Sequence, residues 1–185
     1  MSRLEQAIRI DYTGSAPGFH QFDGYSDKVA ELIRASRASI SDGKTLVVID
    51  RGFNLPDDKP CIVTDHLNFT GDNPLVGPNP DCGERFPVVN DVYLELHQTT
   101  SPNKTLPLKN PLSRALTGIA AGIKSGVEPA AAELEKMSSL GADFYCYNVV
   151  PTMLVAAHAG YKVFALALPE GRALEPESIS YLKGE

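Results

Sequence analysis

The side chains best suited to chemistry gather in two loops that are rich in glycine. The first, residues 13–25, reads TGSAPGFHQFDGY and places His20 and Asp23 among aromatic residues. The second, residues 64–87, reads TDHLNFTGDNPLVGPNPDCGERFP and is too polar for a helix or a buried strand. Loops of such length inside compact domains are usually functional or disordered. We therefore expect a ligand site built from these loops, with His20 as one candidate residue.

Neither loop has the spacing of a metal site or of a hydrolytic triad. Ser15, His20 and Asp23 offer a hydroxyl, an imidazole and a carboxylate, but this spacing is not specific for nucleophilic catalysis. The three cysteines, at positions 61, 82 and 146, lack metal-ligand spacing, so we expect no metal. They are typical of reduced thiols in a cytoplasmic protein. The pattern assigns no catalytic residue.

Composition narrows the class of protein. A chain of 185 residues with 43% apolar residues suits a single domain over 1–185. A formal net charge of -6 argues against a surface for nucleic acid or anionic membrane. The first ten residues, MSRLEQAIRI, are charged throughout and predict no signal peptide, and no apolar run reaches membrane-spanning length. We expect a cytoplasmic protein.

Strands alternating with helices must position these loops, which predicts an α/β fold with a mixed sheet. Polar connections or turns separate the apolar runs, and the loop 64–87 leaves the end of one strand, where open α/β sheets bind ligands. A helix or mixed segment is expected at 88–97, and a polar tail from Pro169. The expected strands are 7–12, 45–49, 60–63, 116–123, 144–147 and 163–168, and the expected helices begin at Ser26 (apolar at Val29, Leu32, Ile33 and Ile40), Pro129 (apolar at Leu134, Met137 and Leu140) and Pro151.

Three ordered groups of motifs carry a family resemblance. Residues 65–87 contain DHLN, NPLVGPN and RFP, residues 19–25 read FHQFDGY, and residues 140–160 contain LGAD, VVP and AHAG. Together they resemble the trimeric purine nucleoside phosphorylases and methylthioadenosine phosphorylases. The resemblance implies a nucleoside phosphorylase-like mixed central β-sheet flanked by helices and truncated at both ends. It also implies a homo-oligomer, with a trimer favoured.

The family cleaves purine nucleosides with phosphate to a base and ribose 1-phosphate, so the resemblance implies a purine nucleoside or base as ligand. Phosphate would be a possible co-substrate, and no other cofactor is implied. Phe22 would reach the ribose, Glu128 the purine edge, and Phe86 a neighbouring subunit's site. The substrate-binding residues that the resemblance implies are His20, Phe22, Asp23, Phe86, Glu128, Tyr147 and Asn148.

Several family positions are altered here, most of them around the phosphate. The family's phosphate-binding arginine falls at Gly18 and its phosphate-binding serine at Asn148, while the TNAAGG element lies near VVIDRG, residues 47–52. A hydrogen bond to a charged group contributes about 1.5–3 kcal/mol, so losing several would raise the barrier by roughly 5–8 kcal/mol. We expect a phosphorylase-like protein with a degraded phosphate site. If active, it is a pentosyltransferase; the alternative is a non-catalytic purine-binding or structural homologue.

Some of these residues also have structural explanations. Glu128 could equally stabilise the first turn of the following helix. His66 is expected to bond the backbone at a strand end, and His158 to cap a helix C-terminus through the helix dipole. Phe86 could be plain interface core. All four alternatives stay open at the level of sequence.

Overall fold

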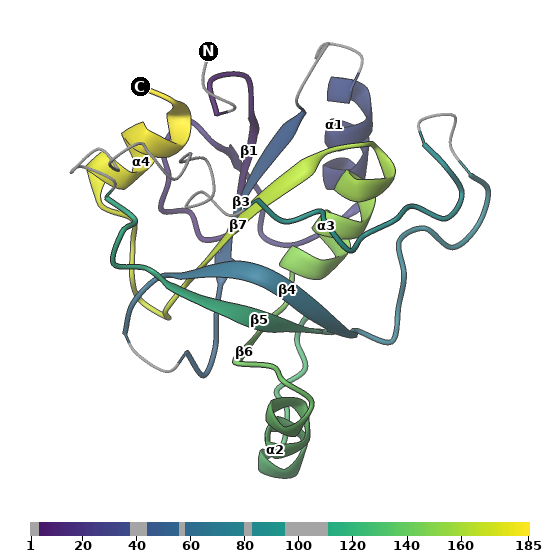
Figure 1. Cartoon of the computed structure of the whole chain (residues 1–185), viewed down its shortest axis with the longest axis vertical. Helices are drawn as coiled ribbons and strands as arrows, with labels where there is room; N and C mark the ends of the chain where they lie inside the picture. The colour runs from purple at the N-terminus through teal and green to yellow at the C-terminus, as the bar shows by residue number, and fades with distance from the viewer. Residues whose placement is uncertain (1–3, 38–43, 56–57, 80–82, 95–110) are drawn as a thin grey trace, which may run out of the picture.

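A seven-stranded sheet and four helices make up the computed structural model, which describes residues 4–37, 44–55, 58–79, 83–94 and 111–185 (Figure 1). The predicted α/β class with a mixed sheet is confirmed. The strands are β1 (Ile8–Asp11), β2 (His20–Gln21), β3 (Thr45–Arg51), β4 (Cys61–Phe69), β5 (Leu116–Ile123), β6 (Phe144–Cys146) and β7 (Lys162–Leu168). The helices are α1 (Asp27–Ser36), α2 (Ala131–Ser139), α3 (Val149–His158) and α4 (Pro176–Lys183).

The strands lie in the order β2-β1-β3-β7-β4-β5-β6. Neighbours run parallel except β4 and β7, which pair antiparallel at Cys61–Ala167 and Ile62–Leu166. Nearer the start of β7, the segment 92–94 takes the place of β4 beside it. There the N–H of Val163 donates to the carbonyl of Val92, and the N–H of Leu94 to that of Val163, both at 2.8 Å.

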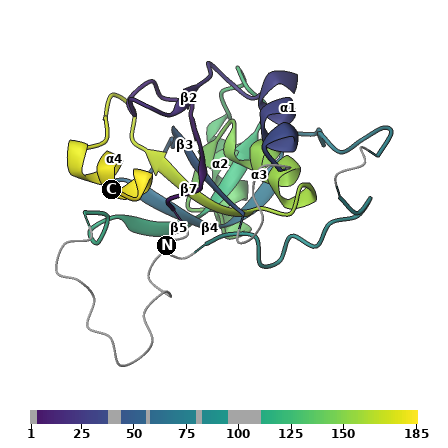
Figure 2. The ribbon, with the colours of Figure 1, turned by 90° about the horizontal axis from the view of Figure 1, so that it is seen from above.

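Helices cover both faces of the sheet. Helices α1 and α3 pack on one face, where Val29, Ile33 and Met153 are completely buried. Helix α4 packs on the other face, where Leu182 joins Val47 and Phe164. Figure 2 shows α4 on the opposite side of the molecule from α1 and α3. Among the described residues, no helix is long and apolar enough to cross a membrane.

Helix α2 projects beyond the edge of the sheet formed by β5 and β6 (Figure 1). Its predicted apolar face is only half covered: Leu134 and Met137 are half-buried beside Tyr145, and Leu140, just beyond the helix, is 52% exposed. The predicted helix therefore forms, but it begins at Ala131, two residues after Pro129, ends at Ser139, and has no buried residue.

The loop predicted at 64–87 begins later than expected. Strand β4 continues to Phe69, paired with β5 across an irregularity between Val63 and Asp65. The polar residues of its second half are tolerated because several of them, such as Asp65 and Asn68, are exposed. The first six residues of the predicted loop are therefore strand.

Four other predictions differ from the structure. The expected polar tail contains α4, because Pro176 suits a first helical turn and Ile179 and Leu182 are buried. Residues 88–94 are not helical, since the backbone of 92–94 pairs with β7; residues 95–97 lie outside the described residues, as does Ile40. The loop 13–25 includes the short strand β2, and α3 begins two residues before Pro151.

Candidate functional site

A buried carboxylate, Asp50, lies at the carboxyl end of β3 and is 1% exposed. Its Oδ1 accepts from the backbone N–H of Arg51 and the Nδ2 of Asn148, both at 2.9 Å. Its Oδ2 accepts from the backbone N–H groups of Asn148 at 2.8 Å and Val149 at 3.2 Å. Asn148 and Val149 open α3, and a helix N-terminus has free N–H groups and positive potential. Burial raises the pKa of Asp50, and these hydrogen bonds oppose that shift.

Asn148 joins this carboxylate to the loop 13–25. Its Oδ1 accepts from the backbone N–H of Tyr25 at 2.8 Å, and burial raises the pKa of the Tyr25 phenol to about 12. In the same loop, the Phe22 ring lies 6.4 Å from the ring of Tyr12, centroid to centroid. The Tyr12 hydroxyl in turn forms a 2.6 Å hydrogen bond with Thr152 on α3. Loop 13–25 is thereby held against the first turns of α3.

Tyr147, just after β6, belongs to an aromatic group. Its ring lies edge-on to Phe53 at 5.2 Å between centroids, and Phe53 stacks on Tyr145 at 5.0 Å. The Tyr147 hydroxyl donates to the carbonyl of Val127 at 3.2 Å. Burial raises the pKa of Tyr147, and the negative charge of Glu128 adds to the effect. The rings of this aromatic group can flank a planar heteroaromatic ligand, and the carboxylate of Glu128 can accept a hydrogen bond from it.

A cavity of about 440 Å³ adjoins Tyr147, at the carboxyl ends of β4 and β5 and beside α1 and α3. This volume is in the range of small-molecule sites. The Nε of Arg34 is buried there and has no hydrogen-bond partner among the residues that the structure describes. The residues that line the cavity include Tyr25, Ile123, Tyr147, Pro151 and Leu154, the cations Arg34 and Lys124, and the carboxylates Asp27 and Asp72.

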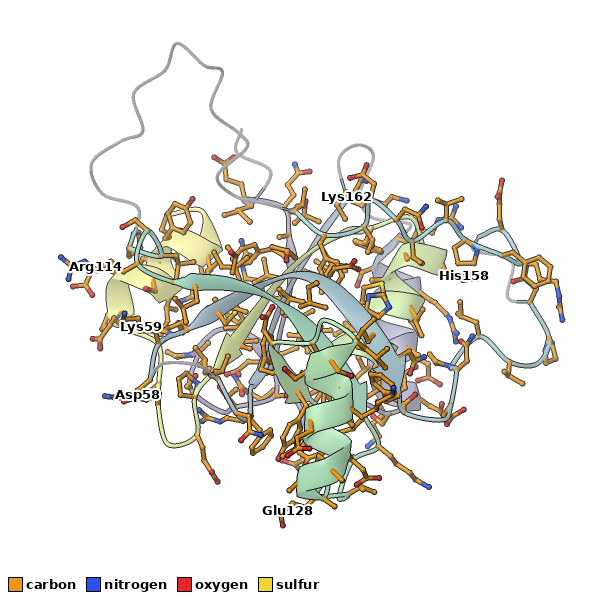
Figure 3. All side chains as sticks on the ribbon, turned by 60° about the horizontal axis from the view of Figure 1, so that its bottom comes forward. Asp58, Lys59, Arg114, Glu128, His158 and Lys162 are labelled. Atoms are coloured by element: carbon orange, nitrogen blue, oxygen red, sulfur yellow. The ribbon has the colours of Figure 1, made fainter. Side chains whose placement is uncertain are left out.

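The structure brings together part of the predicted set of site residues. Tyr147 and Asn148 are adjacent at the start of α3, and Phe22 packs in the core beside that helix. Glu128 is exposed at the outer end of α2 (Figure 3). His20 and Asp23 are exposed on and after the edge strand β2, and Phe86 is 81% exposed.

Two groups at this end of the sheet were missing from the sequence-based set. Asp50 was not selected, because an acidic residue that ends an apolar run such as TLVVID has the same pattern as an ordinary strand end. Arg34 lies on a predicted helix but carries no sign of a ligand site in the sequence. His158 is the last residue of α3, the position predicted for it; its Nε2 also hydrogen-bonds Asn79 Oδ1 at 2.8 Å, and burial lowers its pKa.

No family model matches the chain, but comparisons with individual proteins find relatives. The chain is 31% identical to purine nucleoside phosphorylase 1 of Bacillus subtilis (strain 168) over 157 residues, covering 80% of this chain and 55% of that protein. It is 30% identical to the purine nucleoside phosphorylase of Bos taurus over 161 residues, covering 81% of this chain and 54% of that protein.

Solved structures give the same result for the fold. Isoform 2 of purine nucleoside phosphorylase from Schistosoma mansoni, in complex with cytosine and ribose-1-phosphate, matches with a TM-score of 0.65 at 23% identity, over 88% of this chain and 62% of that one. The Schistosoma enzyme in complex with hypoxanthine matches with a TM-score of 0.64 at 21% identity, over 91% of this chain and 78% of that one.

Fold and geometry thus define an α/β protein with a candidate ligand site at the carboxyl ends of its strands. Sequence and fold together show that this chain is a homologue of the purine nucleoside phosphorylases, as its motifs predicted. It spans about half the length of the curated relatives it matches.

Proposed function

We propose that this chain binds a purine nucleoside or base at the carboxyl ends of its central strands. The observation that carries the proposal is the junction at Tyr147 and Asn148. Tyr147 bonds the carbonyl of Val127, next to Glu128, and Asn148 bonds the N–H of Tyr25 in loop 13–25. Three separate parts of the chain, two of which carry a motif of the family, therefore meet at one place.

The ligands of similar proteins support a purine. Structures of the Schistosoma relatives are described in complex with guanosine and with hypoxanthine. The rings of Phe53, Tyr145 and Tyr147 supply flat apolar surfaces, which suit a planar base. We propose nucleoside phosphorylase-like chemistry for this site, with phosphate as possible co-substrate.

A specific observation favours the second candidate, binding without phosphorolysis. The family's phosphate-binding serine falls at Asn148, whose N–H and side-chain amide both donate to Asp50. The backbone N–H and one amide N–H of Asn148 are thus already satisfied, so the phosphate site would be the degraded part of the pocket.

We further propose that the chain forms a homo-oligomer in the cytoplasm, with a trimer favoured by the family resemblance. Val76, Phe86 and Val88 are each more than 80% exposed within one segment, and exposed apolar residues gathered together suggest a protein contact. Light scattering of the purified chain should give a mass above that of a monomer. A Phe86→Ser variant should shift the protein toward monomer.

Thermal unfolding with added inosine, guanosine or hypoxanthine tests the binding proposal. A ligand at 100 times its Kd stabilises by about 2.7 kcal/mol, equivalent to roughly 5–10 °C for a domain of this size. Phe22→Ala and Glu128→Gln should each reduce the shift. Glu31→Gln, the same change of charge at an exposed position of α1, is the control. Lack of any purine effect on the wild type would refute the proposal.

A further inference from the structure

The Asp50 carboxylate has no free capacity for hydrogen bonding. A carboxylate has about four lone-pair sites, and Asp50 accepts four hydrogen bonds, from Arg51, Val149 and twice from Asn148. At 1% exposure it is also shielded from water. These properties exclude a role as general base, because no lone pair faces a substrate.

The donors around Asp50 are those of an anion site. Two of them are backbone N–H groups at the start of α3, a helix of ten residues, where no helix carbonyl is available to accept from them. A third is the side-chain amide of Asn148. Helix N-termini of this kind hold phosphates and carboxylates in many α/β proteins. The guanidinium of Arg51 turns away, toward the carbonyls of Thr13 and Pro169. The charge of Asp50 is thus met by the N–H groups.

We propose that Asp50 is an internal anion that occupies the N-terminus of α3 and excludes phosphate from it. The proposal rests on the proposed function only in placing a family phosphate contact at Asn148. An incoming phosphate would meet a like charge and would find both backbone N–H groups and one N–H of the Asn148 amide already in use. Asp50 therefore determines the class of ligand at the site: an uncharged nucleoside or base that binds without phosphate.

The wild-type protein gives the first test. Inorganic phosphate is titrated against it in thermal unfolding at constant ionic strength, and ³¹P line widths of the same samples are recorded. We expect no change of the melting temperature relative to chloride and no line broadening. Stabilisation or broadening that saturates with phosphate would overturn the proposal.

Variants that remove the carboxylate give the second test. Asp50→Gly and Asp50→Ser vacate the space at the helix N-terminus, and Asp143→Gly, which removes an exposed carboxylate bonded to one N–H, is the control. Sodium formate, a carboxylate small enough for the vacated space, should raise the melting temperature of the Asp50 variants by about 2–4 °C or more. Neither the control nor the wild type should respond. If a folded Asp50 variant ignores formate, the proposal is wrong; if neither variant folds, the phosphate titration of the wild type decides.

A purine arm separates this inference from the proposed function. Inosine is added to the wild type with and without phosphate. An inosine shift that requires phosphate would overturn the internal-anion proposal while supporting purine binding. No inosine shift at all, together with formate rescue of Asp50→Gly, would refute purine binding and leave the internal anion standing.

Discussion

Gly122 on β5 offers a sharp test of how α3 is seated on the sheet. An added Cβ at this position would lie 2.4 Å from Val150 Cγ2 and 2.7 Å from Val150 Cβ. Val150, in the first turn of α3, is 1% exposed, so neither atom has open space to move into. The Cβ of Val150 is fixed to the helix backbone, and a Gly122→Ala change must therefore displace α3.

The magnitude follows from two opposing effects. Overpacking of a well-packed core destabilises the folded state by about 1–3 kcal/mol. Replacing glycine by alanine stabilises it by about 0.4–1 kcal/mol, because the unfolded chain has less conformational entropy to lose. We expect Gly122→Ala to lower the free energy of unfolding by about 1–2 kcal/mol. Val150→Ala alone removes two buried methyl groups, at about 0.8 kcal/mol each plus a cavity cost.

Combining the two changes makes the test specific. In the double variant the methyl of residue 122 occupies space left by Val150, so the loss of stability should be smaller than the sum of the single losses by about 0.5–2 kcal/mol. Urea unfolding followed by circular dichroism gives all four free energies. Additivity within about 0.3–0.5 kcal/mol, or a more stable Gly122→Ala protein, would refute the packing described for this contact.

Three further predictions concern buried or partly buried polar groups. Burial lowers the pKa of His66 below its usual 6.5, so the folded state binds this proton less readily than the unfolded state. The free energy of unfolding should therefore fall as the pH drops below about 6.5, and unfolding titrations of His66→Phe should show a smaller fall. Arg9 donates to two carbonyls in the last turn of α4 at 3.0 and 2.6 Å, and Arg9→Met should cost about 1.5–3 kcal/mol and speed hydrogen exchange in α4. Tyr12→Phe should cost about 1–3 kcal/mol in urea unfolding, because it leaves the buried Thr152 hydroxyl unpaired.

Each of these has its own control. Equal pH dependence of the wild type and His66→Phe between pH 5.5 and 7.5 would contradict the first. Exchange that speeds up equally in α1 and α4 would show that Arg9 acts on global stability and not on α4. Adding Thr152→Val to Tyr12→Phe should recover part of the loss, and a further full loss would contradict the pairing.

The parts of the fold that could be predicted are those whose sequence pattern fits a single kind of element. Strand β5 was predicted with its observed bounds, because a strand buried over most of its length is a continuous apolar run ended by a turn. The end of β4 was missed since Asp65 and Asn68 are exposed there and resemble loop residues. Helix α4 was missed because its polar composition conceals the buried pair Ile179 and Leu182.

At the candidate site, motifs located Tyr147 and Asn148, but the residue that engages Asn148 was not predicted. The donors from α3 to Asp50 lie 98 and 99 residues further along the chain. No local pattern reports a hydrogen bond over such a separation, so a lone acidic residue after an apolar run is indistinguishable from a strand end. The exposure of His20 and Asp23 likewise depends on β2 being an edge strand, which only the sheet order reveals.

The position of β7 in the sheet has a consequence for how the chain is made. This strand lies between β3 and β4, yet it follows all the other described strands in the sequence, and its pairing with β3 joins Thr45 to Lys162. Until residue 168 has emerged, the inner edges of β3 and β4 have no partner strand, and unpaired edges are templates for aggregation. Such long-range pairing also slows folding. During synthesis the chain therefore carries two incomplete half-sheets with exposed edges until β7 has emerged, and we expect aggregation to compete with folding in that interval.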